Sequence, residues 1–294
     1  MNLENITKKL DTYERLMRLD KPIGILLLLW PTLWALWLAS RGLPDWITLL
    51  IFITGAVLMR SAGCVMNDIA DRKYDGQVER TKNRPLATGE VSVKEAYLLA
   101  AGLSLAAFGL VLLFNKTTIL LSFAALFLAA TYPFTKRFLA IPQAYLGVAF
   151  GFAIPMAFAA VNEFIPPLAW ILLVANVFWA IAYDTEYAMV DRDDDLKIGI
   201  KSSAIFFGKY DVIAVMVCYA LMLAILVYIG KFMGFGNFYF IGLGAALVLA
   251  YRQYVLIEKR LKTDCFKAFL HNNWIGLVIF LGLVAEYYSR IQPI

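Results

Sequence analysis

Two short segments of the chain carry acidic side chains at a regular spacing. In the first, Asn67, Asp71 and Asp75 recur every four residues, and in the second Asp191 and Asp195 are four residues apart. Residues at this spacing share one face of a helix, where like charges repel one another, so a positive partner has to compensate them. Oxygen ligands without a nearby His or Cys favour a hard cation, Mg²⁺ before Zn²⁺. The pattern therefore predicts that these five residues bind Mg²⁺.

Basic residues accompany both acidic segments. Arg and Lys bind phosphate oxygens, and Mg²⁺ in proteins is commonly held by carboxylates together with substrate phosphates. A diphosphate placed between the acids and the bases would neutralise both, and in a membrane it would carry a lipid tail. The candidates for binding the diphosphate or a second substrate are Arg60, Asp68, Lys82, Arg84, Lys136, Lys197 and Lys201, with Arg18, Lys21 and Asp184 as further candidates.

A structural interpretation of these residues stays open. A single acidic run can be a solvated helix end that pairs with its basic neighbours, and any one Lys can be an ordinary residue of a cytoplasmic loop. Two such runs at equivalent places favour a metal–diphosphate site. Arg60 lies inside an apolar segment, where a charge is costly and indicates function, although it could instead pair with a neighbouring helix. His271, the only histidine, is expected at the membrane interface and is given no role.

The composition indicates what kind of scaffold positions these residues. Of the 294 residues, 61% are hydrophobic and 17% are charged, and the mean hydropathy is +0.70. Soluble domains are about half apolar and about a quarter charged. This excess excludes an ordinary cytosolic enzyme, a disordered chain and a nucleic-acid-binding module. Cys64, Cys218 and Cys265 form no CxxC or CxxH pattern, so we expect free thiols.

Nine apolar segments approach the roughly 20 residues that a membrane-spanning helix needs. They are 22–40, 46–66, 93–114, 117–135, 141–161, 166–188, 210–230, 237–251 and 270–288. If the N-terminus is inside, 22 of the 27 basic residues fall in inner segments and four in outer ones, as the positive-inside rule requires. We therefore predict an all-α, polytopic membrane protein of about nine helices with a cytoplasmic N-terminus.

The long connections are also expected on the inner side, at 67–92, 189–209 and 252–269. The two acidic segments lie in the first two of these connections, so we expect the active-site loops of a multi-pass inner-membrane protein to face the cytoplasm. The spacing further predicts one domain over 1–294, with tandem four-helix units at about 22–135 and 141–251 and a last helix at 270–288.

Both acidic motifs resemble known signatures. Asn67-x-x-x-Asp71-x-x-x-Asp75 is followed by KNRPL at 82–86, and Asp191-x-x-x-Asp195 is followed by GIKS at 199–202. These motifs resemble those of the UbiA-type intramembrane aromatic prenyltransferases. The similarity continues through 16–37, 59–76, 154–161 and 182–202, and within the family it is close to the bacterial ubiquinone-pathway branch.

The resemblance implies a nine-helix fold around a central cavity that opens sideways to lipid. It implies that Mg²⁺ on the two motifs holds a polyprenyl diphosphate, and that the prenyl group moves to the carbon ortho to the hydroxyl of 4-hydroxybenzoate. No nucleic acid and no obligate protein partner are expected. The catalytic residues that it implies are Asp71, Asp75, Asp191 and Asp195, with Arg72 and Arg137 at positions where the family has important bases.

Three alternatives remain at this point. An enzyme of the same fold could act on another acceptor, such as homogentisate or a naphthoate. A cation transporter would also place acids near membrane helices, but near the midplane rather than at the helix ends. A CDP-alcohol phosphotransferase should carry a contiguous D-G-x-x-A-R motif, which this sequence lacks.

Overall fold

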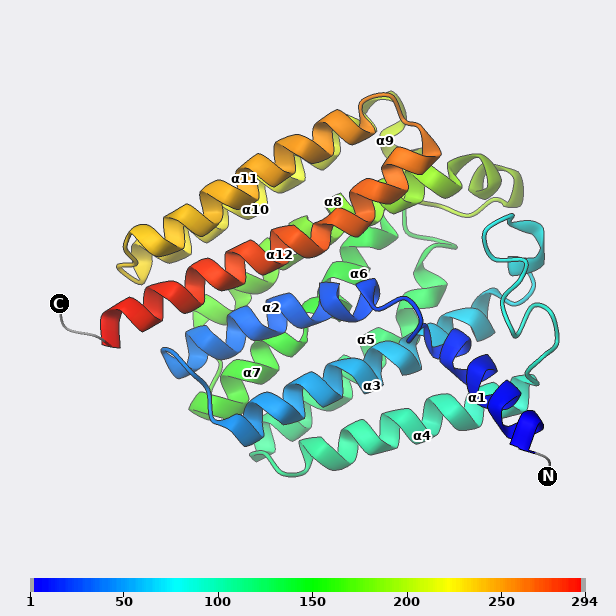
Figure 1. Ribbon diagram of the computed structural model, residues 1–294, viewed down its shortest axis with the longest axis horizontal. Helices are drawn as coiled ribbons and strands as arrows, with labels where there is room; N and C mark the ends of the chain where they lie inside the picture. Colours follow the sequence, from blue (N-terminus) through cyan, green and yellow to red (C-terminus); the bar gives the residue numbers. More distant parts are fainter. Residues whose placement is uncertain (1–2, 292–294) are drawn as a thin grey trace.

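The protein, described by a computed structural model over residues 3–291, is an all-α bundle with no β-strand in that range (Figure 1). A first helix, α1 (Leu3–Met17), precedes the bundle. Nine helical segments among the described residues are long and apolar enough to cross a membrane. These are α2 (Ile23–Ser40), α3 (Trp46–Asp71), α4 (Val93–Val111), α5 (Lys116–Thr135), α6 with α7 (Pro142–Gly151, Ala153–Asn162), α8 (Pro167–Ile198), α9 with η2 and α10 (Ser203–Phe207, Gly208–Tyr210, Asp211–Phe232), α11 (Asn237–Ile257) and α12 (Lys262–Ile291). The predicted all-α, nine-helix membrane fold is confirmed, and the side of its N-terminus stays a prediction.

Several helices extend beyond their apolar segments. Helix α3 continues to Asp71, α8 continues to Ile198, and α12 already begins at Lys262. Polar residues can continue a helix into water because the backbone hydrogen bonds are internal to it. Helix α8 ends only at Gly199, whose φ of +73° gives a left-handed cap that glycine tolerates. The prediction of long connections at 189–209 and 252–269 is therefore wrong, since both stretches are largely helical and the loops within them are short.

The spacing predicts that the first acidic motif lies on one continuous helix. This prediction is wrong, because the helix is interrupted within the motif. Helix α3 ends at Asp71, and Asp75 begins the short 3-10 helix η1 (Asp75–Gln77). The hydroxyl of Thr81 donates to the Asp75 carbonyl at 2.8 Å, which folds the connection back toward α3. The fifth span is also interrupted, at Phe152. Pro155 has no N–H to donate to the carbonyl four residues earlier, which explains the break.

The long helix α8 packs against α6, α10 and α12, while α2 contacts α7 and α12 and α3 contacts α4. Trp34 of α2 and Trp179 of α8 stack at the centre with ring centroids 5.2 Å apart. Figure 1 shows α1 and the end of α12 at opposite ends of the bundle, as an odd number of spans requires. The segment 72–92 and the end of α8 lie at the α1 end, so the bundle brings the two acidic segments to one face. Residues 1–2 and 292–294 of the predicted domain 1–294 lie outside the described residues.

Candidate active site

Two adjoining cavities occupy the α1 end and the interior of the bundle. The larger, which we term the apolar cavity, has a volume of about 970 Å³ and is lined mainly by apolar side chains of α2 to α6 and α8. The smaller, termed the polar chamber, has a volume of about 160 Å³. The residues common to both walls are Asn67, Arg80, Arg84, Tyr132, Asp184 and Tyr187. A ligand could therefore place a polar head in one and an apolar tail in the other.

The polar chamber gathers all five residues of the two acidic motifs. Asn67 and Asp71 come from α3, Asp75 from η1, and Asp191 and Asp195 from α8. Helices α3 and α8 are far apart in the sequence, and it is the packing of the bundle that brings their polar ends to one chamber. The two motifs therefore belong to a single site.

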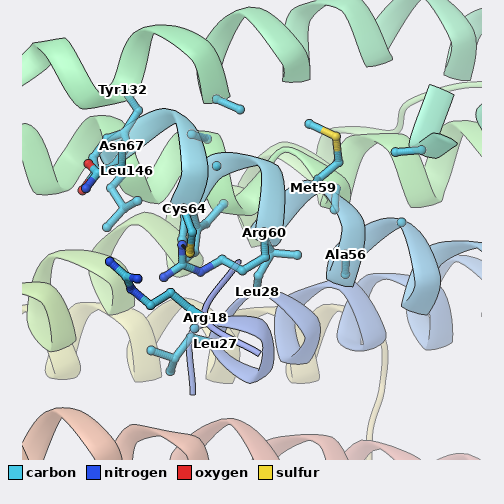
Figure 2. A pocket seen from close by; sticks show the side chains of 18 of the residues that line it. Arg18, Leu27, Leu28, Ala56, Met59, Arg60, Cys64, Asn67, Tyr132 and Leu146 are labelled. Atoms are coloured by element: carbon cyan, nitrogen blue, oxygen red, sulfur yellow. Dashed lines mark hydrogen bonds between the residues drawn. The ribbon is translucent and has the colours of Figure 1, made fainter. Parts of the chain in front are cut away.

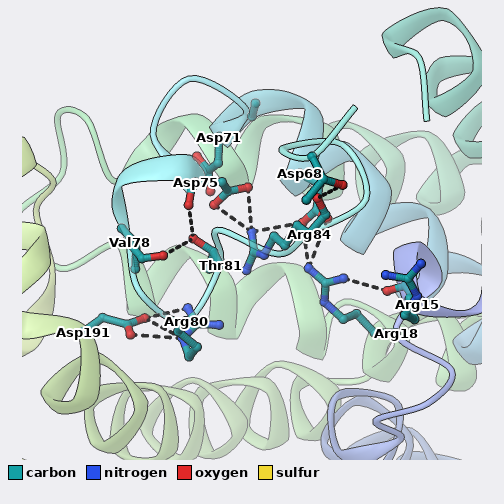
Figure 3. Close-up of polar contacts among 12 residues, drawn as sticks. Arg15, Arg18, Asp68, Asp71, Asp75, Val78, Arg80, Thr81, Arg84 and Asp191 are labelled. Atoms are coloured by element: carbon teal, nitrogen blue, oxygen red, sulfur yellow. Dashed lines mark hydrogen bonds and ion pairs between the residues drawn. The ribbon is translucent and has the colours of Figure 1, made fainter. Parts of the chain in front are cut away.

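Asp68, only 1% exposed, joins three segments of the chain (Figure 3). Its carboxylate accepts from Arg18 at 2.9 and 3.1 Å and forms an ion pair with Arg84 at 3.0 Å. The same Arg84 nitrogen donates to both oxygens of Asp75 at 3.0 Å. Burial raises the pKa of Asp75, although Arg84 acts in the opposite direction. The region after α1, the end of α3 and the 72–92 segment are thus tied together beside the chamber.

Arg80 connects the 72–92 segment to α8. It donates from Nε to Asp191 Oδ1 at 3.0 Å and from Nη2 to Oδ2 at 2.6 Å, a bidentate pair (Figure 3). Its guanidinium also lies over the Tyr187 ring, 4.6 Å from the centroid. Bidentate geometry and stacking together fix the plane of the guanidinium, so a basic group is held in the wall that the two cavities share.

Two acids of the chamber are not fully paired with other side chains. Asp71 Oδ2 accepts from Lys136 Nζ, but its Oδ1 is buried without a hydrogen-bond partner. Asp195 has no ion pair among residues 3–291. No three acidic, His or Cys side chains of the described part converge as a complete metal cage. A set of oxygen ligands, only a few of which are free of protein partners, fits a hard cation. Such a cation takes its remaining ligands from a bound phosphate and water.

A second charged group projects into the apolar cavity. Arg60 of α3 donates from Nη1 to Cys64 Sγ at 2.7 Å and lies 5.4 Å from the Phe150 ring centroid (Figure 2). Its Nε is buried with no partner, and no carboxylate pairs with it among the described residues. A Cβ at Gly24 would lie 2.4 Å from that Nε, so the glycine leaves room for the guanidinium. Arg60 is therefore a membrane-embedded cation that forms no ion pair with a carboxylate of the described residues.

Two predicted bases lie outside both cavities. Arg72 caps α3 and donates back to the Ile69 carbonyl at 3.3 Å. Arg137 donates to the Ala70 carbonyl at 2.9 Å and lies over the Phe134 ring. Neither side chain lines the apolar cavity or the polar chamber.

Of the predicted lysines, two lie away from the cavities and three line one of them. Lys82 is exposed and paired with Glu79, and Lys197 is exposed and paired with Asp194 one turn away. The remaining three border a cavity: Lys136 and Lys201 line the polar chamber, and Lys21 lies at the edge of the apolar cavity. The sequence did not single out Tyr132 and Tyr187, since aromatic residues are common in membrane helices and these two carry no distinguishing spacing.

Comparison with known proteins identifies the family. Residues 28–277 match the UbiA prenyltransferase family. The chain belongs to this family. It is 63% identical over 290 residues to the 4-hydroxybenzoate octaprenyltransferase of Methylobacillus flagellatus, an alignment covering 99% of this chain and 98% of the relative. It is also 63% identical to the enzyme of the same name from Azoarcus sp., over 96% of this chain and 98% of that one. The predicted family membership and the prediction of a prenyltransferase are confirmed.

Solved structures agree with the fold. A UbiA homologue from Aeropyrum pernix in its apo form superposes with a TM-score of 0.78 at 25% identity, over 89% of this chain and 97% of the other. A UbiA homologue from Archaeoglobus fulgidus, solved with GPP and Mg²⁺, superposes with a TM-score of 0.68 at 19% identity, over 95% of this chain and 99% of the other. The UbiA family members thus share this helical bundle.

Proposed function

We propose that this protein transfers a polyprenyl group from a polyprenyl diphosphate to the carbon ortho to the hydroxyl of 4-hydroxybenzoate, as a membrane step of ubiquinone biosynthesis. The observation that carries the proposal is the junction of the polar chamber with the apolar cavity that holds the unpaired Arg60. The names of its relatives at about the 60% level of identity support the same acceptor.

The diphosphate head belongs in the polar chamber. Asn67, Asp71, Asp75, Asp191 and Asp195 are the residues we propose to hold Mg²⁺ there. A bound Mg²⁺ supplies positive charge against the negative charge that develops on the departing diphosphate. The basic residues of the same walls, Arg80, Arg84, Lys136 and Lys201, would add positive charge beside the phosphate oxygens.

The prenyl tail belongs in the apolar cavity, whose mainly apolar walls disfavour the water that could capture the allylic cation. Loss of the diphosphate generates that cation beside Tyr132, Tyr183 and Tyr187, all of which line the cavity. Aromatic faces stabilise a nearby cation. The electron-rich ring carbon of the acceptor then attacks it.

The acceptor is oriented by its carboxylate on Arg60, which forms no ion pair with a described residue. The attacked ring has to lose a proton. Asp184 borders both cavities and has no ion pair among residues 3–291, so we propose it as the base. Asp191 is less suited to this role because it is held by Arg80. Replacement of Asp184 by Asn should slow turnover while leaving the binding of both substrates intact.

The location of the site within the cell is part of the proposal. The chamber lies at the α1 end of the bundle, where the basic connections gather, so we place it at the cytoplasmic face of the inner membrane. The acids of the two motifs lie at helix ends rather than near the middle of the spans, which disfavours a cation transporter. The division into two four-helix units and a last helix likewise remains a proposal.

A membrane assay with labelled octaprenyl diphosphate and a panel of aromatic acids tests this function. Incorporation of label into 4-hydroxybenzoate that EDTA abolishes and Mg²⁺ restores is the expected result. Product from homogentisate or a naphthoate, with none from 4-hydroxybenzoate, would overturn the acceptor assignment. Transfer that persists undiminished in EDTA would contradict the metal assignment.

A further inference from the structure

A buried polar cluster, none of whose side chains lines either cavity, joins three membrane helices. It consists of Glu186 of α8, Tyr219 of α10, Asn272 of α12 and Trp179 of α8, each at most 1% exposed. No Lys, Arg or His side chain of the described residues is hydrogen-bonded or ion-paired to Glu186. An ionised carboxylate buried without a cation is costly, and more so within a membrane.

The orientation of the Asn272 amide follows from its neighbours. Trp179 Nε1, which can only donate, lies 2.9 Å from Asn272 Oδ1. On the other side, the Asn272 Nδ2 donates to the carbonyl of Ala268 at 3.1 Å. A flipped amide would place its NH₂ group against the Trp179 N–H, which are both donors. It would also place its oxygen against the Ala268 carbonyl, which are both acceptors. The oxygen of Asn272 therefore faces Trp179, and its nitrogen faces Ala268.

With that orientation fixed, three contacts form a closed ring. Tyr219 Oη lies 2.9 Å from Glu186 Oε1 and 2.8 Å from Asn272 Oδ1, and Asn272 Nδ2 lies 2.7 Å from Glu186 Oε2. If Glu186 were ionised, the single Tyr219 hydrogen would have to serve two acceptors, and one pair of oxygens would face each other with no hydrogen between them. A proton on Glu186 supplies the missing hydrogen: Glu186 donates to Tyr219, Tyr219 to Asn272, and Asn272 back to Glu186.

We infer that Glu186 is a neutral carboxylic acid that locks α8 to α10 and α12, and that it acts as a positioning residue for the reaction. The neighbouring Tyr183, Asp184 and Tyr187 of α8 line the apolar cavity, and Asp191 lines the polar chamber. Trp179, bonded to the ring, stacks on Trp34 and contacts the Tyr183 ring edge-on at 5.5 Å. The ring therefore sets the rotation of α8. Its protonation is independent of the proposed function, whereas its positioning role rests on that function.

Infrared spectroscopy of the full-length protein in nanodiscs, with isotope-labelled glutamate, tests the protonation. A protonated-carboxyl C=O band is expected at neutral pH, and Glu186→Gln should remove it. Glu286 is the matched control, because this buried glutamate accepts from the Gly236 backbone N–H at 2.7 Å and pairs with Arg290 at 2.9 Å. Glu286→Gln should leave the band in place. A spectrum without a Glu186-dependent band would overturn the inference.

Thermal stability and kinetics test the positioning role. In Glu186→Gln the amide N–H can donate to Tyr219 and the amide oxygen can accept from Asn272, so the melting temperature and kcat should stay near wild type. Glu186→Leu should lower kcat by about tenfold at a temperature where it remains folded, since it leaves buried partners unsatisfied. Glu286→Gln should lower the melting temperature, because it removes the negative charge that pairs with Arg290. A Gln variant as impaired as the Leu variant would refute the role. If the wild-type protein does not prenylate 4-hydroxybenzoate, the proposed function is wrong. The infrared spectra still test the protonation of Glu186 in that case.

Discussion

Arg60→Leu is the most informative single substitution near the acceptor. Arg60 carries a positive charge inside a membrane helix, has a buried Nε without a partner, and lines the apolar cavity. If a benzoate carboxylate is its partner, removing the guanidinium removes a desolvated ion pair. Truncation of one member of such a pair costs about 2 kcal/mol or more, which corresponds to a rise of about thirtyfold in the KM for 4-hydroxybenzoate.

Steady-state kinetics with both substrates varied is the assay. The KM for polyprenyl diphosphate should change little, since the loss affects ground-state binding of the acceptor alone. With 4-hydroxybenzamide, which lacks the anion, wild type and Arg60→Leu should have similar KM values. Arg252, exposed on α11 and outside both cavities, provides the control, and Arg252→Leu should leave both KM values unchanged.

Stability separates binding from a structural role. Because Arg60 forms no ion pair among residues 3–291, Arg60→Leu should leave the melting temperature unchanged or higher. A fall in melting temperature together with equal rises in both KM values would refute the assignment of Arg60 to the acceptor.

Three further predictions follow from the same structure. Asp71→Asn should slow transfer about a hundredfold or more while the protein stays folded by size-exclusion chromatography, because the free Oδ1 is proposed to face the metal; near-normal turnover would contradict this. A reporter fused after Lys82 should lie in the cytoplasm and one after Asn162 on the opposite side, so that the same side for both would refute the span count. Arg15 holds the pKa of Glu90 below its usual 4.5. This contact therefore stabilises the protein above that pH and is lost as pH falls through the lower folded value, so hydrogen exchange in α1 should rise only in acid for wild type but already at neutral pH in Glu90→Gln.

The existence and number of the helices could be predicted because membrane spans are long runs of apolar residues, a signal that does not depend on tertiary packing. Their ends could not be predicted from the same signal. Helices α3 and α8 continue through polar residues as far as Asp71 and Ile198, where hydropathy no longer marks them. The break at Phe152 follows from Pro155. The hydrophobic residues on either side of this proline predict one uninterrupted span, so hydropathy does not show the break.

The candidate site was predictable in composition but not in its contacts. Regular spacing pointed to both acidic motifs, and the bundle places them around one chamber. The Arg80–Asp191 pair joins residues 111 positions apart, so only the packing of α8 against the 72–92 segment creates it. The ring around Glu186 was missed for the same reason, since its three members come from three helices and none has a spacing that stands out.

The proposed reaction forms a carbon–carbon bond at one position of one acceptor. Purified protein in nanodiscs, supplied with octaprenyl diphosphate, Mg²⁺ and 4-hydroxybenzoate, should yield a single product whose mass spectrum and proton NMR place the prenyl group on the ring carbon ortho to the hydroxyl. A prenyl ether, a prenyl ester, or no product from this acceptor would contradict the account.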